Sequence, residues 1–117
     1  MYRPVIFVSA MLLFCAAHAP ARAMEICEAM VAAEETRTQV AGVVTEAKSD
    51  TEYPYLFVVD KAGQCEIFVE VADAKMMHNC VKGAHVTAIG ILRWDEEAAF
   101  LEDIVVNYLA AASVVCE

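Results

Sequence analysis

The sequence predicts a small all-β domain, a closed barrel of five short strands with one short helix between the third and the fourth. Three observations support this. Segments rich in β-branched and aromatic residues are separated by short runs that contain Gly, Pro or charged residues. The two-residue strand period is clearest where Glu66, Phe68 and Glu70 alternate with apolar neighbours. That period is lost after Val71 and resumes after Gly83.

The first 23 residues predict a secretory signal peptide. Arg3 gives a positive start, residues 5–17 are apolar and uncharged, and small residues stand at Ala21 and Ala23. The apolar run is shorter than the roughly 20 residues that a membrane-spanning helix needs. We expect cleavage after Ala23, with cleavage after Ala19 as the alternative. The mature domain would then be residues 24–117, located in the bacterial periplasm or secreted, with no membrane anchor.

The first half of this domain predicts a helix and three strands. In residues 25–35 apolar side chains recur every three to four positions, which indicates a short N-terminal helix. Residues 38–46 are rich in β-branched side chains around Gly42, which predicts a strand that bends. After a polar loop, residues 55–60 and 65–71 form two strands of a hairpin, joined by a turn at 61–64.

The second half of the domain predicts a short helix, which interrupts the series of strands, and two more strands. Asp73 can cap a short helix, because the residues that follow it are good helix formers. Residues 85–94 predict the fourth strand, with Gly90 interrupting its row of side chains. An acidic turn at 95–99 leads to a fifth strand at 100–108. For residues 109–117 the pattern predicts no particular structure.

This element order is that of the OB-fold, a five-stranded Greek-key barrel. The stretches VAGVV (40–44), YLFVVDKAG (55–63), IFVEV (67–71) and VKGAHVTAIGIL (81–92) resemble the anticodon-binding-like OB superfamily. The chain is also similar to small exported bacterial OB proteins. It departs from the superfamily pattern at Ala88, where a larger β-branched residue is preferred. The resemblance implies the fold but no ligand, because the superfamily serves many functions. The matching positions are Gly42, Phe57, Asp60, Gly63, Gly83, Val86 and Gly90.

The barrel interior is predicted from the two strands with the clearest alternation. We expect Met76 or Met77 to fill the barrel floor, because a flexible thioether suits an irregular gap. The inward-facing rows are expected to be Ile67, Val69 and Val71 on the third strand, and Val86, Ala88 and Leu92 on the fourth.

Four cysteines remain after the signal, and they predict two disulfides. An even number in a small exported domain favours cystines. A zinc site is the alternative, but no closely spaced C-x-x-C pair is present. The predicted topology places all four at one end of the barrel. We therefore expect the pairs Cys27–Cys116 and Cys65–Cys80, with the two other pairings remaining open.

The mature domain is strongly acidic. Residues 24–117 hold six Lys and Arg against 17 Asp and Glu, a net charge of −11. Such a chain repels phosphate backbones at long range, and its basic residues do not cluster. Single-stranded nucleic-acid binding, which aromatic side chains on an OB barrel can support, is therefore a disfavoured alternative, and we expect no nucleic-acid partner.

No arrangement of residues predicts catalysis, so we expect a protein that is not an enzyme and has no cofactor. Ser49 and Ser113 have no histidine near them in sequence, and no C-x-x-C redox pair exists. We instead predict a non-enzymatic binding or interaction module for an unknown protein or small ligand. Its contacts are expected on the barrel face and on the acidic loop after the fourth strand. They are Tyr55, Phe57, Phe68, Trp94, Asp95 and Glu96.

The stretch KMMHNC (75–80) raises a second alternative, a protein that handles soft metal ions such as copper or zinc. Its ligands would be Met76, His78 and His85. On a helix, however, Met76 and Cys80 share a face and His78 lies on the other side. We therefore favour a core and disulfide role for this stretch, and no resident metal.

Overall fold

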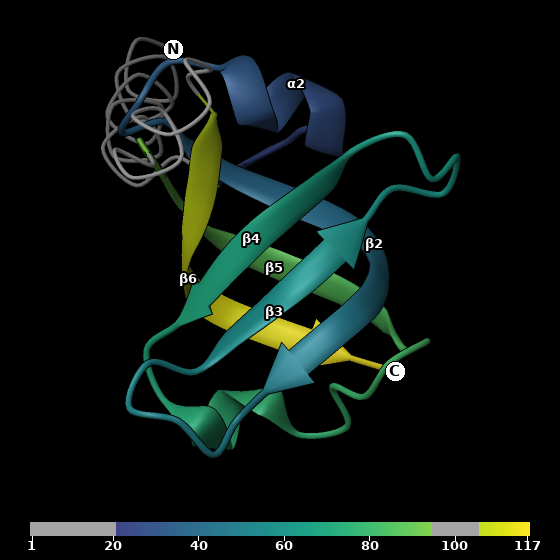
Figure 1. Cartoon of the computed structure of the whole chain (residues 1–117). Helices are drawn as coiled ribbons and strands as arrows, with labels where there is room; N and C mark the ends of the chain where they lie inside the picture. Colours follow the sequence, from purple (N-terminus) through teal and green to yellow (C-terminus); the bar gives the residue numbers. More distant parts are fainter. Residues whose placement is uncertain (1–20, 95–105) are drawn as a thin grey trace, which may run out of the picture.

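The computed structural model describes residues 21–94 and 106–117, and these form a closed five-stranded barrel (Figure 1). The strand order is β2-β3-β4-β6-β5, and a β2–β5 pairing closes the barrel. β4 and β6 run parallel, and the other barrel pairs are antiparallel. The predicted OB-fold class is confirmed. The strands are β2 (Arg37–Lys48), β3 (Tyr55–Val59), β4 (Glu66–Val71), β5 (His85–Trp94) and β6 (Asn107–Cys116).

β2, with 12 residues, is the longest strand of the described part of the chain, because it pairs with two neighbours. Its residues 37–43 pair with β5, and its residues 43–48 pair with β3. A Cβ on Gly42 would overlap the Val59 carbonyl oxygen, so only glycine fits where the strand passes from one partner to the other. Gly90 on β5 meets the backbone of Ala110 on β6 in the same way. Both glycines lie at places of close backbone approach, as expected for a small barrel.

The interior is made by the predicted rows. All six residues expected to face inward are buried, and Leu56, Val58 and Leu109 complete the core from β3 and β6. Each fully buried Val, Leu or Ile contributes about 1.5–3 kcal/mol relative to an exposed position. The residues that alternate with these core positions on β3 and β4 consequently point outward.

Two short helices close the barrel at its opposite ends (Figure 1). α2 (Ile26–Val31) covers one end with Ile26 and Ala29, which are both buried. The Nδ2 group of Asn107 donates to the carbonyls at the end of α2, 3.0 Å from Ala29 O and 2.8 Å from Ala32 O. The 3-10 helix η1 (Ala74–Met77) covers the other end with buried Met77. In the described part of the chain, no helix is long and apolar enough to cross a membrane.

A two-residue strand, β1 (Arg22–Ala23), pairs in parallel with the start of β2. Thr38 is completely buried, and its Oγ1 donates to the Arg22 carbonyl oxygen at 2.7 Å. β1 thus provides the hydrogen-bond acceptor for a buried hydroxyl of the barrel. Both residues of β1 nevertheless lie before the predicted cleavage site after Ala23. Residues 1–20 lie outside the described residues, so the signal peptide and its boundary remain predictions.

The fifth strand was predicted too early in the sequence. We expected it at residues 100–108, whereas β6 occupies Asn107–Cys116 and residues 95–105 lie outside the described ranges. Alanine has a low strand propensity, so the pattern at 109–112 gave no strand signal. Tertiary packing decides this position, because Gly90 has no Cβ and therefore lets the backbone of Ala110 and Ala111 approach β5 closely.

Two disulfides are present, but the predicted pairing was wrong. The pairs are Cys27–Cys65 and Cys80–Cys116, with Cα–Cα distances of 5.3 and 5.1 Å. Cys65 lies just before β4, and Cys116 is the last residue of β6. Because β4 and β6 run parallel, these two cysteines lie at opposite ends of the barrel. One disulfide therefore ties α2 to the β3–β4 turn, and the other ties the segment after η1 to the end of β6.

Candidate functional site

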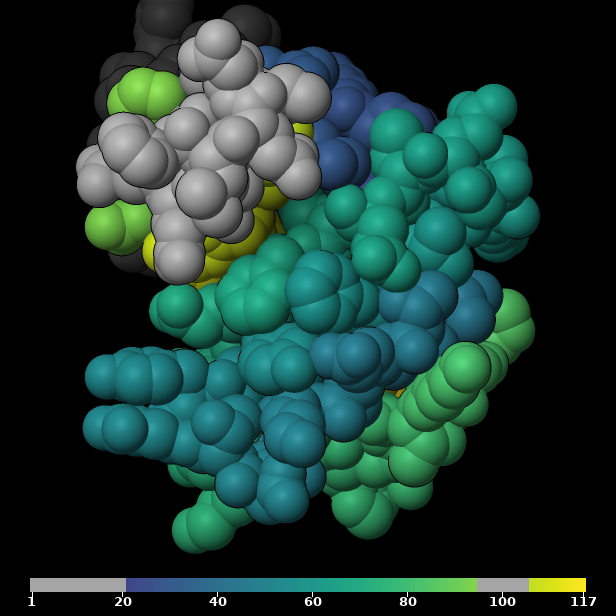
Figure 2. Space-filling view, in the orientation of Figure 1, coloured from purple at the N-terminus to yellow at the C-terminus, as the bar shows by residue number. Residues whose placement is uncertain are grey.

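Four aromatic side chains gather on the outer surface of the barrel, and we call them the aromatic face. They are partly buried and outward-pointing, because their strand neighbours are buried in the core. β3 and β4 form a continuous surface on the side of the molecule shown in Figure 2. β6 extends this surface through its parallel pairing with β4. The members of the aromatic face are Tyr55 and Phe57 on β3, Phe68 on β4 and Tyr108 on β6.

Phe68 is the centre of the aromatic face and contacts the other three rings. It stacks on Tyr55 with centroids 5.2 Å apart, and meets Phe57 edge to face at 5.3 Å. It also meets Tyr108 edge to face at 6.1 Å. Tyr55 and Phe57 contact each other at 5.7 Å. The rings hold one another in place, so the face is a preformed apolar platform.

Carboxylates border the aromatic face. Glu46 lies opposite Phe57 in the β2–β3 register, and Glu70 lies opposite Tyr55 in the β3–β4 register. Glu66 extends the border at the start of β4, where its Oε2 accepts from Thr45 Oγ1 at 2.6 Å. All three side chains belong to exposed residues, which leaves their charges accessible to a ligand.

Two basic residues also stand at the edges. Lys48 lies opposite Tyr55 on β2, and Arg93 lies opposite Tyr108 on β5. Arg93 is neutralised by Glu35, with 3.7 Å between Nε and Oε1. Glu46 and Lys48 therefore alternate along the β2 edge of the face, and Arg93 lies at the β5 edge. Glu66 and Glu70 lie on either side of Phe68 on β4.

One tyrosine of the face has a perturbed acidity. Tyr55 Oη donates to Glu46 Oε2 at 2.8 Å. This hydrogen bond raises the pKa of Tyr55 above its ordinary value, with smaller contributions from burial and from the Glu46 charge. The hydrogen bond therefore favours the protonated phenol, whose O–H is directed at the carboxylate.

A shallow apolar groove of about 470 Å³ continues the aromatic face across β6. Ala110 follows Tyr108 by two residues on the same side of β6, and it lies opposite Glu70 and Ile91. Because the β6 side chains here are small, the surface is lower than over the rings. The groove is lined by Arg37, Glu70, Ala72, Gly90, Ile91 and Ala110–Ala112.

The structure brings together three of the six predicted contact residues. Tyr55, Phe57 and Phe68 share the aromatic face, as the alternation of their strands predicts. Trp94 follows Arg93 on β5, so its side chain lies on the other side of the strand, and its backbone N–H donates to Glu34 Oε2 at 3.1 Å. It is therefore not in line with the aromatic row. Asp95 and Glu96 lie outside the described residues.

Tyr108 is the ring of the aromatic face that sequence reasoning missed. It stood at the end of the predicted fifth strand, with no indication of which neighbour that strand would take. The parallel pairing of the last strand with β4 is the signal that could have placed Tyr108 beside Phe68. The OB topology supplies that pairing, whereas the local sequence does not.

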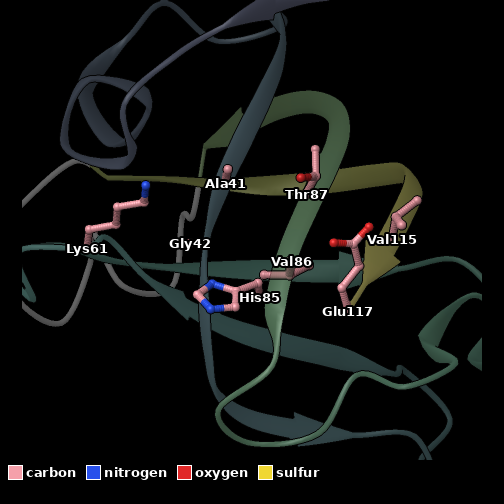
Figure 3. A pocket seen from close by; sticks show the side chains of 8 residues that line it. All are labelled: Ala41, Gly42, Lys61, His85, Val86, Thr87, Val115 and Glu117. Atoms are coloured by element: carbon pink, nitrogen blue, oxygen red, sulfur yellow. The ribbon is translucent and has the colours of Figure 1, made fainter.

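The soft-metal alternative named His78 and His85 as imidazole ligands, and in residues 21–94 and 106–117 these two histidines join no cluster of potential metal ligands. Both histidines are exposed. His85 instead borders a hollow of about 160 Å³ between β2, β5 and the end of β6. Figure 3 shows Lys61 and Glu117 on opposite sides of the His85 imidazole. Met76 packs against the core.

Solved structures with similar folds are OB domains. The OBody AM2EP06, bound to hen egg-white lysozyme, has a TM-score of 0.68 at 15% identity, over 83% of this chain and 94% of that one. YgiW from E. coli has a TM-score of 0.58 at 15% identity, and the match covers 83% of this chain and 91% of YgiW. Asparaginyl-tRNA synthetase from Pyrococcus horikoshii has a TM-score of 0.63 at 14% identity. This match covers 80% of this chain but only 22% of the synthetase.

These likenesses, all at low identity, define the class of the protein as a single OB-fold barrel. No protein-family model matches the sequence, and no curated protein matches it. The chain spans nearly the whole length of the OBody and of YgiW, but about a fifth of the synthetase. Its function must therefore be argued from its own surface.

Proposed function

We propose that the protein is an exported, non-enzymatic binding module that holds a positively charged polypeptide segment on its aromatic face. The single observation that carries this proposal is the preformed cluster of Tyr55, Phe57, Phe68 and Tyr108. Partly exposed aromatic side chains supply most of the binding energy in many protein interfaces. Because the rings already support one another, little conformational entropy is lost when a partner docks.

The charge of the partner follows from the groups that border the rings. Glu46, Glu66 and Glu70 would attract Lys or Arg side chains, and aromatic faces bind cations directly. The net charge of −9 for the whole chain acts in the same direction at longer range. Nucleic acid is disfavoured by the same carboxylates, which would lie beside its phosphates.

Two further observations support an exported binding protein. Two disulfides fit an oxidising compartment, such as the periplasm or the cell exterior. The OBodies, which share this barrel, are bound to a protein, lysozyme. An OB barrel can therefore present a protein-binding surface, and the present chain would do so through β3, β4 and β6.

The proposal is tested by titrating the oxidised, isotope-labelled protein with a short Lys- and Arg-rich peptide. Backbone amide shifts should concentrate on β3, β4 and β6, and the affinity should fall as salt is added. A peptide of equal length with Gln in place of Lys and Arg should bind much more weakly. Equal binding of the two peptides, or shifts located elsewhere, would overturn the proposal.

Two variants and one competing ligand make the test sharper. Phe68→Ala removes the central ring and should weaken peptide binding about tenfold or more. Val115→Ala is the matched control, because Val115 is an exposed apolar residue outside the aromatic face. Single-stranded DNA should show no saturable binding at low salt, and tight binding would favour the nucleic-acid alternative instead.

A further inference from the structure

A second group of side chains lies away from the aromatic face, around the disulfide that holds α2. The ligand atoms of Cys27, Asp60 and Cys65 all lie within 4.8 Å of one another. They form the one group of three or more potential metal ligands in residues 21–94 and 106–117. In the oxidised protein the two sulfurs are bonded to each other, so they are not available as thiolates.

We propose that this group becomes a divalent-metal site of the zinc class when the Cys27–Cys65 disulfide is reduced. The two cysteine thiolates and Asp60 Oδ2 would be three protein ligands, with water in the fourth position. The mixed sulfur and oxygen donors suit Zn²⁺, which accepts both Cys and Asp in tetrahedral sites. The oxidised form would have no such site, so metal uptake would report the redox state of the protein.

The distances already fit the carboxylate ligand. Zn–S bonds of about 2.3 Å and Zn–O bonds of about 2.0 Å in a tetrahedron separate a sulfur from an oxygen by about 3.5 Å. Asp60 Oδ2 lies 3.5 Å from Cys27 Sγ. The same geometry needs the two sulfurs about 3.8 Å apart. Their Cα atoms are 5.3 Å apart, and side-chain rotation after reduction can separate the sulfurs without moving the backbone.

Asp60 is held in the orientation that the site requires. Its Oδ1 accepts a hydrogen bond from Gln64 N at 2.7 Å. The backbone of Asp60 is fixed by hydrogen bonds to Cys65 and Gly63 on either side of the turn. Oδ2 is thereby directed at Cys27 Sγ. Oδ1 keeps its hydrogen bond to Gln64 N, a supporting contact of the kind that carboxylate ligands of metals commonly have.

The two disulfides differ in their exposure to a reductant. Cys27 lines an open cleft of about 720 Å³, together with Glu25, Glu28, Asp60 and Lys61. Cys27 and Cys65 are both half-buried, whereas Cys80 and Cys116 are buried, with exposed fractions of 6% and 7%, although Cys80 also borders a hollow of about 570 Å³. A small dithiol can therefore attack the Cys27–Cys65 bond while the second disulfide remains intact, because exchange depends on access to the sulfur.

The reaction balances with a dithiol as the reductant. One dithiol is oxidised to its own disulfide and transfers two electrons and two protons, which yields two cysteine thiols. Binding of the metal then releases two protons, because the ligands are thiolates. The proposed metal would replace the covalent link between α2 and the β3–β4 turn, so that the barrel end stays closed in the reduced form.

The test is a Co²⁺ titration of the full chain after limited reduction by a dithiol and anaerobic removal of the reductant. A thiol count should show that two cysteines are reduced, and peptide mapping should identify them as Cys27 and Cys65. One Co²⁺ per chain should then bind, with the charge-transfer absorption that marks thiolate ligands. The untreated, oxidised protein should show no such absorption.

Two variants separate the proposed site from incidental binding. Asp60→Asn should weaken Co²⁺ binding about tenfold or more, whereas Glu28→Gln, in the same cleft, should leave it unchanged. Cys27→Ser retains a single thiol and should abolish the thiolate signal even if Asp60→Asn fails to fold. Reduction of Cys80–Cys116 first, absence of thiolate absorption, or equal affinity in Asp60→Asn would overturn the proposal.

Discussion

The phenolic oxygen of Tyr55 lies 2.8 Å from Glu46 Oε2 and donates a hydrogen bond to it across the β2–β3 pair. This contact joins the edge of the aromatic face to the acidic border beside it. It fixes the position of one ring and directs one carboxylate, so it links the apolar and charged parts of the proposed binding surface.

The contact predicts a measurable pH dependence. The pKa of Tyr55 is raised from 10.0, so the folded protein holds the phenol proton more tightly than the unfolded chain does. The stabilisation is therefore fully present below the unfolded pKa, and it is lost as pH rises through the folded value. We expect Glu46→Gln to move the Tyr55 titration midpoint back toward the ordinary value, as followed by NMR of labelled tyrosine. The control Glu66→Gln should leave the midpoint in place.

Gly90 should tolerate no side chain. A Cβ there would overlap the Ala110 carbonyl oxygen, and backbone cannot retreat as a flexible side chain can. We expect Gly90→Ala to lower the free energy of unfolding by about 3 kcal/mol, at the upper end of overpacking effects. Gly63→Ala is the contrast, since Gly63 has open space around it and a φ of 71°. Its cost should be about 1 kcal/mol, and equal losses in urea denaturation would contradict this account.

Loss of either disulfide should destabilise the barrel to a similar degree in the chain-entropy model. The two bonds join residues 38 and 36 positions apart, and loops of this length are worth about 4 kcal/mol. The double variant Cys80→Ala/Cys116→Ala and the double variant Cys27→Ala/Cys65→Ala test this by thermal unfolding. Peptide mapping of the oxidised parent should recover both linkages. Detection of Cys65 linked to Cys80 would contradict the topology.

The start of the chain should affect stability through Thr38. A chain that begins at Ala21 keeps the Arg22 carbonyl, which accepts from the buried Thr38 hydroxyl. A chain that begins at Met24, the product of cleavage after Ala23, leaves this hydroxyl without that partner. We expect the shorter chain to be less stable by about 1–3 kcal/mol. The variant Thr38→Val should remove most of the difference, and no difference between the two parent chains would disprove the role of β1.

Much of the barrel could be predicted because its strands carry a local signal. The alternation in residues 65–71 separates a buried row from an outward row, and the structure confirms both. The fourth strand was predicted at residues 85–94, the bounds that β5 has. The outward positions of Tyr55, Phe57 and Phe68 follow from the same two-residue period, so three of the four rings of the aromatic face were available from the sequence.

The sequence by itself thus determined the class of fold, the buried rows, the acidic charge and the presence of two cystines, because each depends on residue type or local period. Only the tertiary structure decided which cysteines pair and where along the chain the last strand lies, which places Tyr108 beside Phe68. Both depend on the parallel pairing of β4 with β6, a contact between segments far apart in the chain. Local periodicity carries no information about such a contact, because the direction and order of strands are settled by how the whole sheet closes.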